Sequence, residues 1–210
     1  LVISATYDML LEKRLEAEGI PHWIVAHVLY SRDGVHDGKI LVVRRGKETS
    51  AEICRADAFI MPTGDELVIY KVLGSPFLAD FADPGDDLDT VVVTESDHLT
   101  FVGRLENEHT RVPDAFSVPF KRSGLLFLGY SLDLWHYRLV VRVFAHGRNR
   151  PRRTNAVLPQ VRAKKIFAIR QPTSQLEELY WQRLPCDMIK VDPDQFAEQL
   201  MTVLSPVGVV

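Results

Sequence analysis

Three residues that follow an apolar run, Gly129, Ser131 and Asp133, have the types that could bind a phosphate-bearing ligand. A Gly allows close approach of the backbone, a Ser hydroxyl donates or accepts a hydrogen bond, and an Asp can cap the start of a helix. In parallel α/β sheets, ligands bind beyond the carboxyl ends of the strands, where helix N-termini direct N–H groups at phosphates. A Gly and a Ser also occur in such turns for conformational reasons alone, so the motif by itself leaves both roles open.

The segment that must position these residues reads as a strand, a tight turn and a helix. Leu125 to Leu128 form an unbroken apolar run, which predicts a strand covered on both faces. Beyond the turn, apolar residues recur at helical spacing at Leu132, Trp135, Leu139, Val140 and Val143. The segment is therefore predicted to be half of a parallel βαβ unit.

The same alternation extends over nearly the whole chain. Strands are expected at residues 1–3, 23–28, 40–43, 67–72, 90–93, 125–128, 165–169 and 188–191. Helices are expected at residues 7–18, 95–106, 113–120, 174–183 and 194–204, with Thr94 as the cap of the second, while residues 49–66 are predicted to be mostly loop. This order predicts an α/β fold with a mostly parallel, doubly wound sheet, and residues 1–210 are expected to form a single domain.

Composition excludes several classes of protein. The chain has 210 residues, 46% of them hydrophobic and 25% charged, and a net charge of −3, which argues against a dominant nucleic-acid surface. The basic cluster at residues 148–153 and the aspartate-rich segment at 79–89 are predicted to be solvated loops, the second in preference to a metal site. Cys54 and Cys186 lack metal-ligand or disulfide spacing, and no stretch is long and apolar enough to span a membrane, so a cytoplasmic location is predicted.

Several short motifs, taken in order, resemble the sirtuin-like domain of bacterial NAD-consuming defence proteins. The family's first strand-to-helix turn, Thr-Thr-Asn-Tyr-Asp, is matched by residues 4–8, and its Lys-Leu-His-Gly by residues 71–74. A Val-Val-Thr-Glu segment is matched at 92–95, and Leu-Phe-Leu-Gly-Tyr-Ser-Leu by residues 126–132. The remaining matches are Leu11-Glu12, Trp135, Arg138, Leu176-Glu177 and Trp181.

The resemblance implies a Rossmann-like sheet that binds NAD, and it assigns roles to individual positions. Thr6 and Leu73 stand where active members have an Asn that positions water and a His that acts as a base, so both catalytic positions are degenerate. Asp8 is the third candidate catalytic residue, with helix capping as its alternative role. The implied cofactor-binding residues are Tyr7, Gly74, Ser75, Gly129, Tyr130 and Ser131, and no metal is implied.

A further departure lies at the start of the chain. The family begins with a strand and a glycine-rich loop that cradles the pyrophosphate, and nothing before Leu1 provides them. The fold is therefore expected to lack its first strand and that loop, either because the chain is a fragment, because the missing strand comes from elsewhere, or because the fold has been cut down. Elsewhere, Lys71 is expected to be solvated rather than bound to a phosphate, and His27 and His36 are the nearest candidates for a substitute catalytic base.

Three functions remain open at this point. The chain could be an active NAD glycohydrolase, which converts NAD to nicotinamide and ADP-ribose. It could instead bind NAD or an ADP-ribose-like nucleotide without cleaving it, as a regulatory part of an anti-phage defence system. It could also be a non-catalytic assembly module in a homo-oligomer or larger defence complex. Loss of both catalytic residue types favours the second function.

Overall fold

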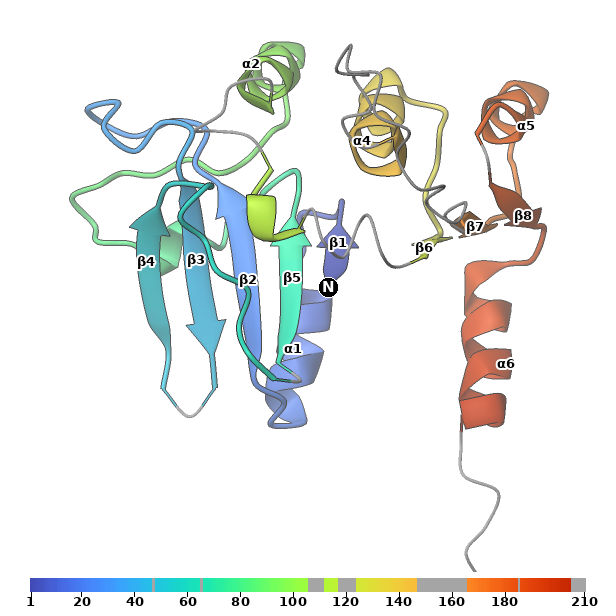
Figure 1. Cartoon of the computed structure of the whole chain (residues 1–210), viewed down its shortest axis with the longest axis horizontal. Helices are drawn as coiled ribbons and strands as arrows, with labels where there is room; N and C mark the ends of the chain where they lie inside the picture. The colour runs from blue at the N-terminus through green and yellow to red at the C-terminus, as the bar shows by residue number, and fades with distance from the viewer. Residues whose placement is uncertain are drawn as a thin grey trace, which may run out of the picture. The chain divides into compact units, whose positions relative to one another are not determined.

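The computed structural model describes residues 1–46, 48–64, 66–105, 112–116, 124–146, 166–184 and 186–204 (Figure 1). Its contacts divide the chain into two compact units, Leu1–Val118 and Pro119–Val210, and each unit is described by itself. The single domain expected from the sequence stays a prediction. The basic cluster at 148–153 lies outside the described residues, and only residues 114–116 of the helix expected at 113–120 are described as helical.

The first unit is built on a five-stranded sheet in the order β1-β5-β2-β3-β4. Strands β1 (Val2–Ser4), β5 (Leu67–Lys71) and β2 (His22–His27) are parallel to one another, whereas β3 (Ile40–Arg45) and β4 (Ser50–Cys54) add antiparallel pairs. The prediction of loop at residues 49–66 is wrong at β4, an exposed edge strand that hydrogen bonds to β3. The predicted Rossmann-like α/β architecture is confirmed. Strands β1, β5 and β2 are parallel, so their carboxyl ends meet at the edge of the sheet where a ligand would bind.

Two helices cover opposite faces of this sheet. Met9, which precedes α1 (Leu10–Ala17), packs in one cluster with Ile24 and Ala26 of β2. Phe101 of α2 (Glu95–Leu105) instead contacts the ring of His27, with ring centroids 5.6 Å apart. Because alternate residues of a strand point to opposite faces, these contacts place α1 and α2 on different sides of β2. Both faces of the central strands are therefore buried.

Helix α2 begins where the sequence predicted. The Thr94 hydroxyl accepts a hydrogen bond from the backbone N–H of Asp97 at 3.1 Å, and the Asp97 carboxylate accepts from the backbone N–H of Thr94 at 2.8 Å. This reciprocal pair is a capping box, which satisfies two N–H groups that the helix itself cannot pair. The predicted cap is thus confirmed.

The segment before α2 differs from the prediction, because residues 90–93 do not form a strand. Regular pairing nearby is limited to a bridge between Asp89 and Tyr30. The backbone N–H of Val92 donates to the carbonyl of Leu73 at 3.0 Å, and Thr90 bonds to Ser75. The segment therefore bonds to the turn after β5 instead of running beside a strand. The aspartate-rich segment before it contains one short 3-10 helix, η1 (Ala79–Phe81).

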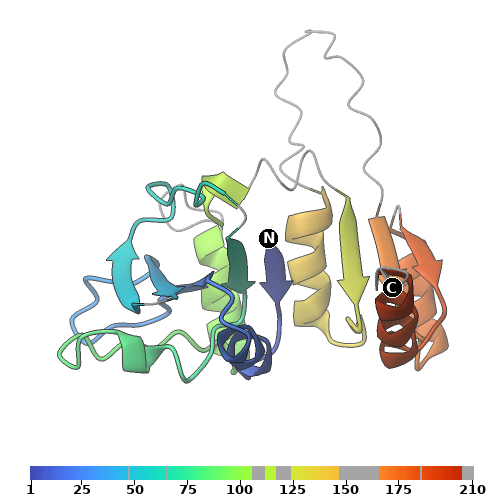
Figure 2. The ribbon, with the colours of Figure 1, turned by 90° about the horizontal axis from the view of Figure 1, so that it is seen from below.

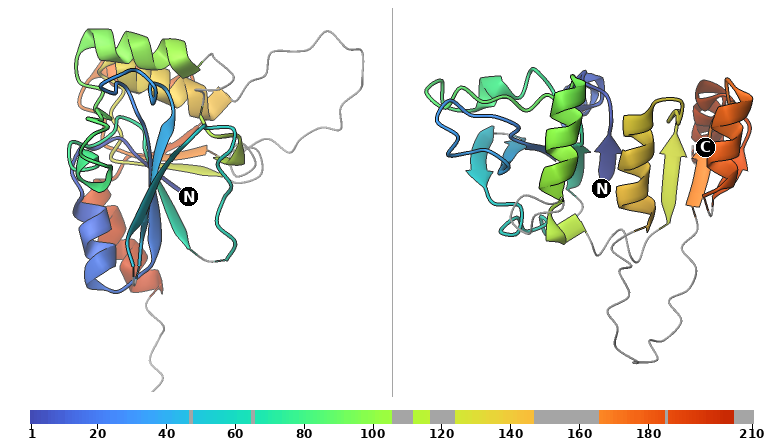
Figure 3. Two further views of the ribbon diagram at one scale, coloured as in Figure 1. Left: turned by 90° about the vertical axis from the view of Figure 1, so that its left-hand side faces the viewer. Right: turned by 90° about the horizontal axis from the view of Figure 1, so that it is seen from above.

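The second unit contains a three-stranded parallel sheet in the order β6-β7-β8, which can be followed in Figure 2. Its strands are β6 (Leu125–Leu128), β7 (Ile166–Ile169) and β8 (Asp187–Ile189). Its helices are α4 (Trp135–His146), α5 (Gln175–Gln182) and α6 (Pro193–Leu204), and Figure 3 shows them from two further sides. Each of the first two strands is followed by a helix, as predicted for parallel βαβ units.

Strand β6 is covered on one face only, contrary to the prediction from its unbroken apolar run. Phe127 packs with Val141 of α4 and Trp181 of α5, whereas Leu126 and Leu128 are 54% and 52% exposed. The two helices lie against the face that carries Phe127, and this leaves the alternate leucines uncovered. Within the described residues, no helix is long and apolar enough to cross a membrane.

Candidate functional site

The turn after β1 carries the first two candidate catalytic residues, Thr6 and Asp8. The Thr6 hydroxyl lies 3.1 Å from the Ser4 hydroxyl, and Asp8 accepts a hydrogen bond from the backbone N–H of Leu10 at 3.0 Å. This hydrogen bond is the largest cause that lowers the pKa of the Asp8 carboxyl, with smaller contributions from Thr6 and the charge of Lys71. Asp8 therefore satisfies an N–H group in the first turn of α1, although the N-cap residue of this helix is Met9 and not Asp8.

A buried lysine lies beneath this turn. Lys71 is the last residue of β5 and its side chain is 1% exposed, so the prediction of a solvated lysine is wrong. Its ammonium group donates to the Ser4 hydroxyl at 3.3 Å and to the backbone carbonyl of Asp8, and it lies 3.4 Å from the Glu12 carboxylate. A buried ammonium group needs such partners because leaving water is costly for a charge. Lys71 is thus bound within the protein and does not face solvent.

The turn after β5 contains Leu73, Gly74 and Ser75. Gly74 has a φ of +70°, and a Cβ placed there would lie 1.7 Å from the carbonyl oxygen of Thr90. Only a glycine accommodates both the left-handed backbone and this close packing. The space beside the Gly74 Cα is filled by the protein's own chain, so close packing requires a glycine at this position.

Hydrogen bonds join the turns after β1 and β5. The Ser75 hydroxyl donates to the carbonyl of Tyr7 at 2.6 Å, and Ser75 is fully buried. The Tyr7 hydroxyl donates to the carbonyl of Val92 at 2.6 Å, and the Thr90 hydroxyl donates to the carbonyl of Ser75 at 2.9 Å. Three predicted cofactor-binding residues, Tyr7, Gly74 and Ser75, are therefore brought together. The hydroxyls of Tyr7 and Ser75 and the close packing of Gly74 hold the turns in place.

Thr6 and Leu73, the two positions predicted to be degenerate, differ in exposure. Thr6 is exposed, whereas Leu73 is 1% exposed. Both belong to turns at the carboxyl ends of neighbouring parallel strands, since β1 pairs with β5 through Ser4 and Lys71. A hydroxyl is available at the first position, and an aliphatic side chain is buried at the second. Neither Thr6 nor Leu73 can take up a proton at neutral pH.

In the second unit, the turn after β6 carries the other predicted cofactor-binding residues, Gly129, Tyr130 and Ser131. Gly129 is exposed with a φ of +64°, and its N–H donates to the carbonyl of Ile169 at 3.1 Å. Tyr130 is mostly buried and donates to the carbonyl of Tyr137 at 3.3 Å, and burial is the main cause that raises its pKa. Gly129 is thus exposed but its N–H is already paired, and the Tyr130 hydroxyl is used internally.

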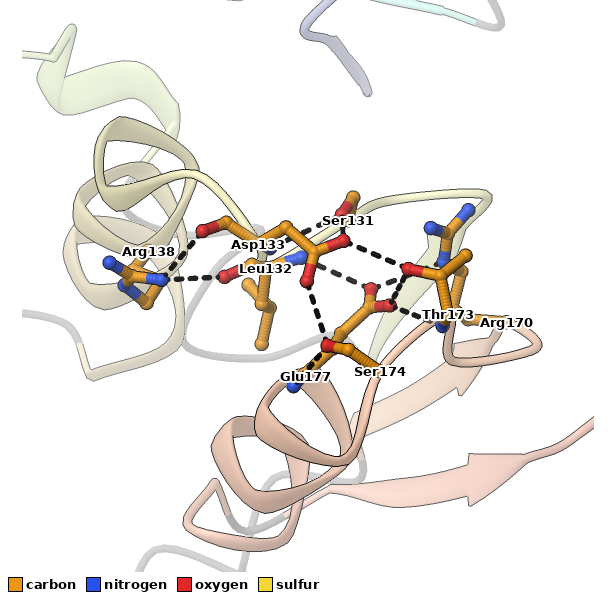
Figure 4. Close-up of polar contacts among 8 residues, drawn as sticks. All are labelled: Ser131, Leu132, Asp133, Arg138, Arg170, Thr173, Ser174 and Glu177. Carbon is orange, nitrogen blue, oxygen red and sulfur yellow. Dashed lines mark hydrogen bonds and ion pairs between the residues drawn. The ribbon is translucent and has the colours of Figure 1, made fainter.

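A network of carboxylates and hydroxyls connects this turn to the one after β7 (Figure 4). The Asp133 carboxylate accepts hydrogen bonds from the hydroxyls of Ser131 at 3.1 Å, Thr173 at 3.0 Å and Ser174 at 3.1 Å. Asp133 is exposed and lies beside the Gly129–Ser131 backbone. The turn therefore carries negative charge, with hydroxyl groups arranged around it.

Glu177 of α5 is the buried centre of the same network. Its carboxylate accepts from the backbone N–H groups of Leu132 at 3.2 Å and Thr173 at 2.9 Å, and from Arg170 at 3.2 Å. Burial opposes ionisation of this carboxyl, but the hydrogen bonds from Thr173, Arg170 and Leu132 outweigh it and lower its pKa. The sequence predicted a helix at residues 174–183, and the structure shows the Ser174 hydroxyl at its start, accepting from the backbone N–H of Glu177. Nothing in the sequence indicated that Glu177 also holds the turn after β6.

Comparison with known proteins assigns the family. The model of the SIR2-like domain matches residues 1–183. The chain belongs to the SIR2-like family. The match includes the strand-to-helix turns after β1 and β6, and it ends before β8 and α6. No curated protein and no solved structure gives a significant match.

Two histidines of this SIR2-like chain, His27 and His36, were predicted as the nearest candidates for a substitute catalytic base, and the structure shows their surroundings. His27 is 5% exposed, with its ring edge-on to Tyr70 and Phe101, and burial lowers its pKa to about 4. His36 lies in the turn before β3, where it contacts Lys39 and lies 3.7 Å from Asp86. Among the residues that the structure describes, no group of three His, Cys, Asp or Glu could hold a metal ion.

Proposed function

We propose that this SIR2-like chain binds NAD or an ADP-ribose-like nucleotide and does not cleave it efficiently. The observation that carries the proposal is Leu73: the position that the family resemblance gives to a His holds a buried aliphatic side chain. A positioned acid or base typically contributes about 10²–10⁴ to a rate, so its loss removes much of the catalytic power. The family match supports the nucleotide class, and the residue types argue against turnover.

Cleavage of NAD requires two functions of the site. The bond between nicotinamide and ribose breaks through an oxocarbenium-like transition state, and a water or another nucleophile must then be oriented toward the ribose. An Asn offers a donor and an acceptor for that purpose, whereas Thr6 offers one hydroxyl, which already lies 3.1 Å from Ser4. Thr6 can contact a ribose hydroxyl, but it cannot hold a water from two sides. The proposed site therefore suits the binding of NAD better than its cleavage.

Some of the residues described at the turn after β6 suit a nucleotide ligand, and others suit only part of it. Gly129 suits close approach of a ligand, because it is exposed, lacks a side chain and follows the carboxyl end of β6, although its N–H already donates to Ile169. Asp133 does not suit a phosphate beside Ser131, because two negative charges would repel each other. Carboxylates do accept hydrogen bonds from ribose hydroxyls, as in dinucleotide-binding folds. We therefore assign a ribose, in preference to a phosphate, to the turn at Ser131 and Asp133.

In the wider setting, the proposed role is that of a regulatory nucleotide-binding part of a bacterial anti-phage defence system. This role rests on the resemblance of the motifs to defence proteins. A domain that binds the nucleotide without consuming it can report its concentration, since the fraction of bound domain rises with the nucleotide concentration and the bound form is stabilised further as that concentration increases.

The proposal is tested by calorimetric titration of the full chain with NAD and, separately, with ADP-ribose. Saturable binding of either ligand is expected. A Ser131→Asp variant should lose it, because a second carboxylate would then occupy the turn, whereas Ser50→Asp on the exposed edge strand should bind like the unmodified chain. Thermal unfolding of each variant confirms that it is folded. Absence of binding to the unmodified chain would contradict the proposal and favour the assembly-module alternative.

A further inference from the structure

The contacts of Lys71 join three consecutive pieces of the chain. Ser4 is the last residue of β1, Asp8 lies in the turn that carries Thr6, and Glu12 lies in α1. Lys71 reaches all three because it pairs with Ser4 in the register of β1 and β5, at the carboxyl end of both strands. One buried ammonium group thus connects the strand, the turn and the helix of the first βα unit.

The partners of Lys71 are not equivalent. The Asp8 carbonyl and the Ser4 hydroxyl both belong to the segment that presents Thr6, and the ammonium group donates to each. Glu12 lies 3.4 Å away and is also 1% exposed, and neither of its carboxylate oxygens has a hydrogen-bond partner among the described residues. Among the residues that the structure describes, Lys71 is therefore the cation that balances this buried carboxylate, and it also binds the turn.

We propose that Lys71 is a positioning residue, which holds the Ser4–Asp8 turn in the conformation that receives the nucleotide. This inference rests on the proposed function. Lys71 acts through the turn and not on the ligand, because its side chain is 1% exposed and its donors are directed at protein oxygens. Preorganised turns bind more tightly because the ordering cost is met before the ligand arrives. Loss of the lysine should therefore weaken binding.

A simpler role for Lys71 would be neutralisation of Glu12 alone. The two roles differ when both charges are removed together. A buried ion pair can often be replaced by neutral residues without loss of stability, whereas removal of one partner leaves an uncompensated charge. A Lys71→Met, Glu12→Gln double variant therefore keeps the charge balanced while it removes the hydrogen bonds to Ser4 and Asp8.

The experiment compares hydrogen exchange and ADP-ribose affinity in the unmodified chain, the double variant, and a Lys13→Met control. Lys13 is adjacent to Glu12 but exposed, so its replacement removes the same charge without touching the turn. In the double variant, amides of residues 4–10 should exchange faster and ADP-ribose should bind about tenfold more weakly, while residues 22–27 and 40–45 keep their protection. The control should match the unmodified chain in both measurements.

Three results would overturn the inference, and the third would overturn the proposed function with it. Unchanged exchange at residues 4–10 in the folded double variant would show that Lys71 only balances Glu12. Faster exchange with unchanged ADP-ribose affinity would show that the turn does not contribute to the nucleotide site. If the unmodified chain binds no ADP-ribose, the proposed function fails, and the inference built on it fails as well. The exchange measurement would still show separately whether Lys71 orders the turn.

Discussion

The hydroxyl of Ser75 donates to the backbone carbonyl of Tyr7 at 2.6 Å and links two turns that are 68 residues apart in the chain. These turns follow β1 and β5, and they carry Thr6 and Leu73. Because Ser75 is fully buried, water cannot replace its hydroxyl without a rearrangement. The relative position of Thr6 and Leu73 therefore depends on a hydrogen bond that neither of them makes.

A Ser75→Ala variant should lower the free energy of unfolding by about 1–3 kcal/mol, the usual cost of leaving a buried carbonyl without its donor. Urea unfolding monitored by circular dichroism measures this change. Ser50→Ala is the matched control, because Ser50 is exposed on β4, and it should change the free energy by less than about 0.5 kcal/mol. Equal stability of the two variants would show that the Ser75 hydroxyl does not hold the turns together.

Gly74→Ala should be more damaging, by about 3 kcal/mol or more, because the added Cβ meets the Thr90 carbonyl as well as a φ of +70°. Gly34→Ala separates the two causes. Gly34 has a φ of +73° but open space around it, so its replacement should cost only the backbone strain, about 1–2 kcal/mol. The same urea measurement compares them, and a similar loss in both variants would argue against the close approach of Thr90.

The buried His27 predicts a pH dependence of stability. Burial lowers its pKa from 6.5 to about 4, so below pH 6.5 the unfolded chain binds a proton at this histidine that the folded chain does not. Its contribution to stability is therefore complete above pH 6.5 and is lost as the pH falls toward 4, by up to about 3 kcal/mol. Unfolding between pH 7 and 4 should show a weaker pH dependence of stability in His27→Phe than in the unmodified chain. Parallel curves for the two chains would contradict a neutral, buried His27.

Replacement of Asp133 tests whether a ribose or a phosphate binds at the turn after β6. Asp133→Asn removes the charge and keeps the size of the side chain. If a ribose hydroxyl donates to the carboxylate, affinity for ADP-ribose should fall about tenfold, whereas a phosphate beside Ser131 would bind more tightly after the change. Calorimetric titration gives the sign, with Asp187→Asn, an exposed aspartate of β8, as the control. Tighter binding by Asp133→Asn would contradict the ribose assignment.

The fold could be predicted from the sequence wherever a local pattern determined the structure. Thr94 and Asp97 indicate the start of α2, because the capping box that they form lies within four residues of the sequence. Strand β4 was missed because Ser50 to Cys54 form an exposed edge that is paired through its backbone, with little apolar alternation to detect. The apolar run in β6 was overinterpreted for the opposite reason, because hydrophobicity alone does not show whether a helix covers each face.

The site was harder to predict because its contacts connect distant segments. Lys71 was expected in solvent, since nothing near it in the sequence indicates that Ser4 and Glu12 will surround it. Glu177 was recognised as part of a helix, but its bond to Leu132 spans 45 residues. The identity of Thr6 and Leu73 could be read directly from the motifs, whereas the burial of Leu73 required the structure.

Restoring the missing groups tests whether the site is otherwise intact. A Thr6→Asn, Leu73→His double variant should gain nicotinamide release from NAD over the unmodified chain. Because Leu73 is buried, the introduced imidazole must become accessible for this gain, so thermal unfolding is measured alongside it. Thr6→Asn alone is the control, and it should gain little without a base. A folded double variant that binds NAD and stays inactive would show that more than these two groups is missing.

The central claim is tested most directly by nicotinamide release from NAD by the unmodified chain at high enzyme concentration, with NAD binding measured on the same sample. We predict saturable binding, with release no faster than in enzyme-free buffer. Release over many turnovers would contradict this account, because it would mean that residues other than Thr6 and Leu73 carry out the cleavage.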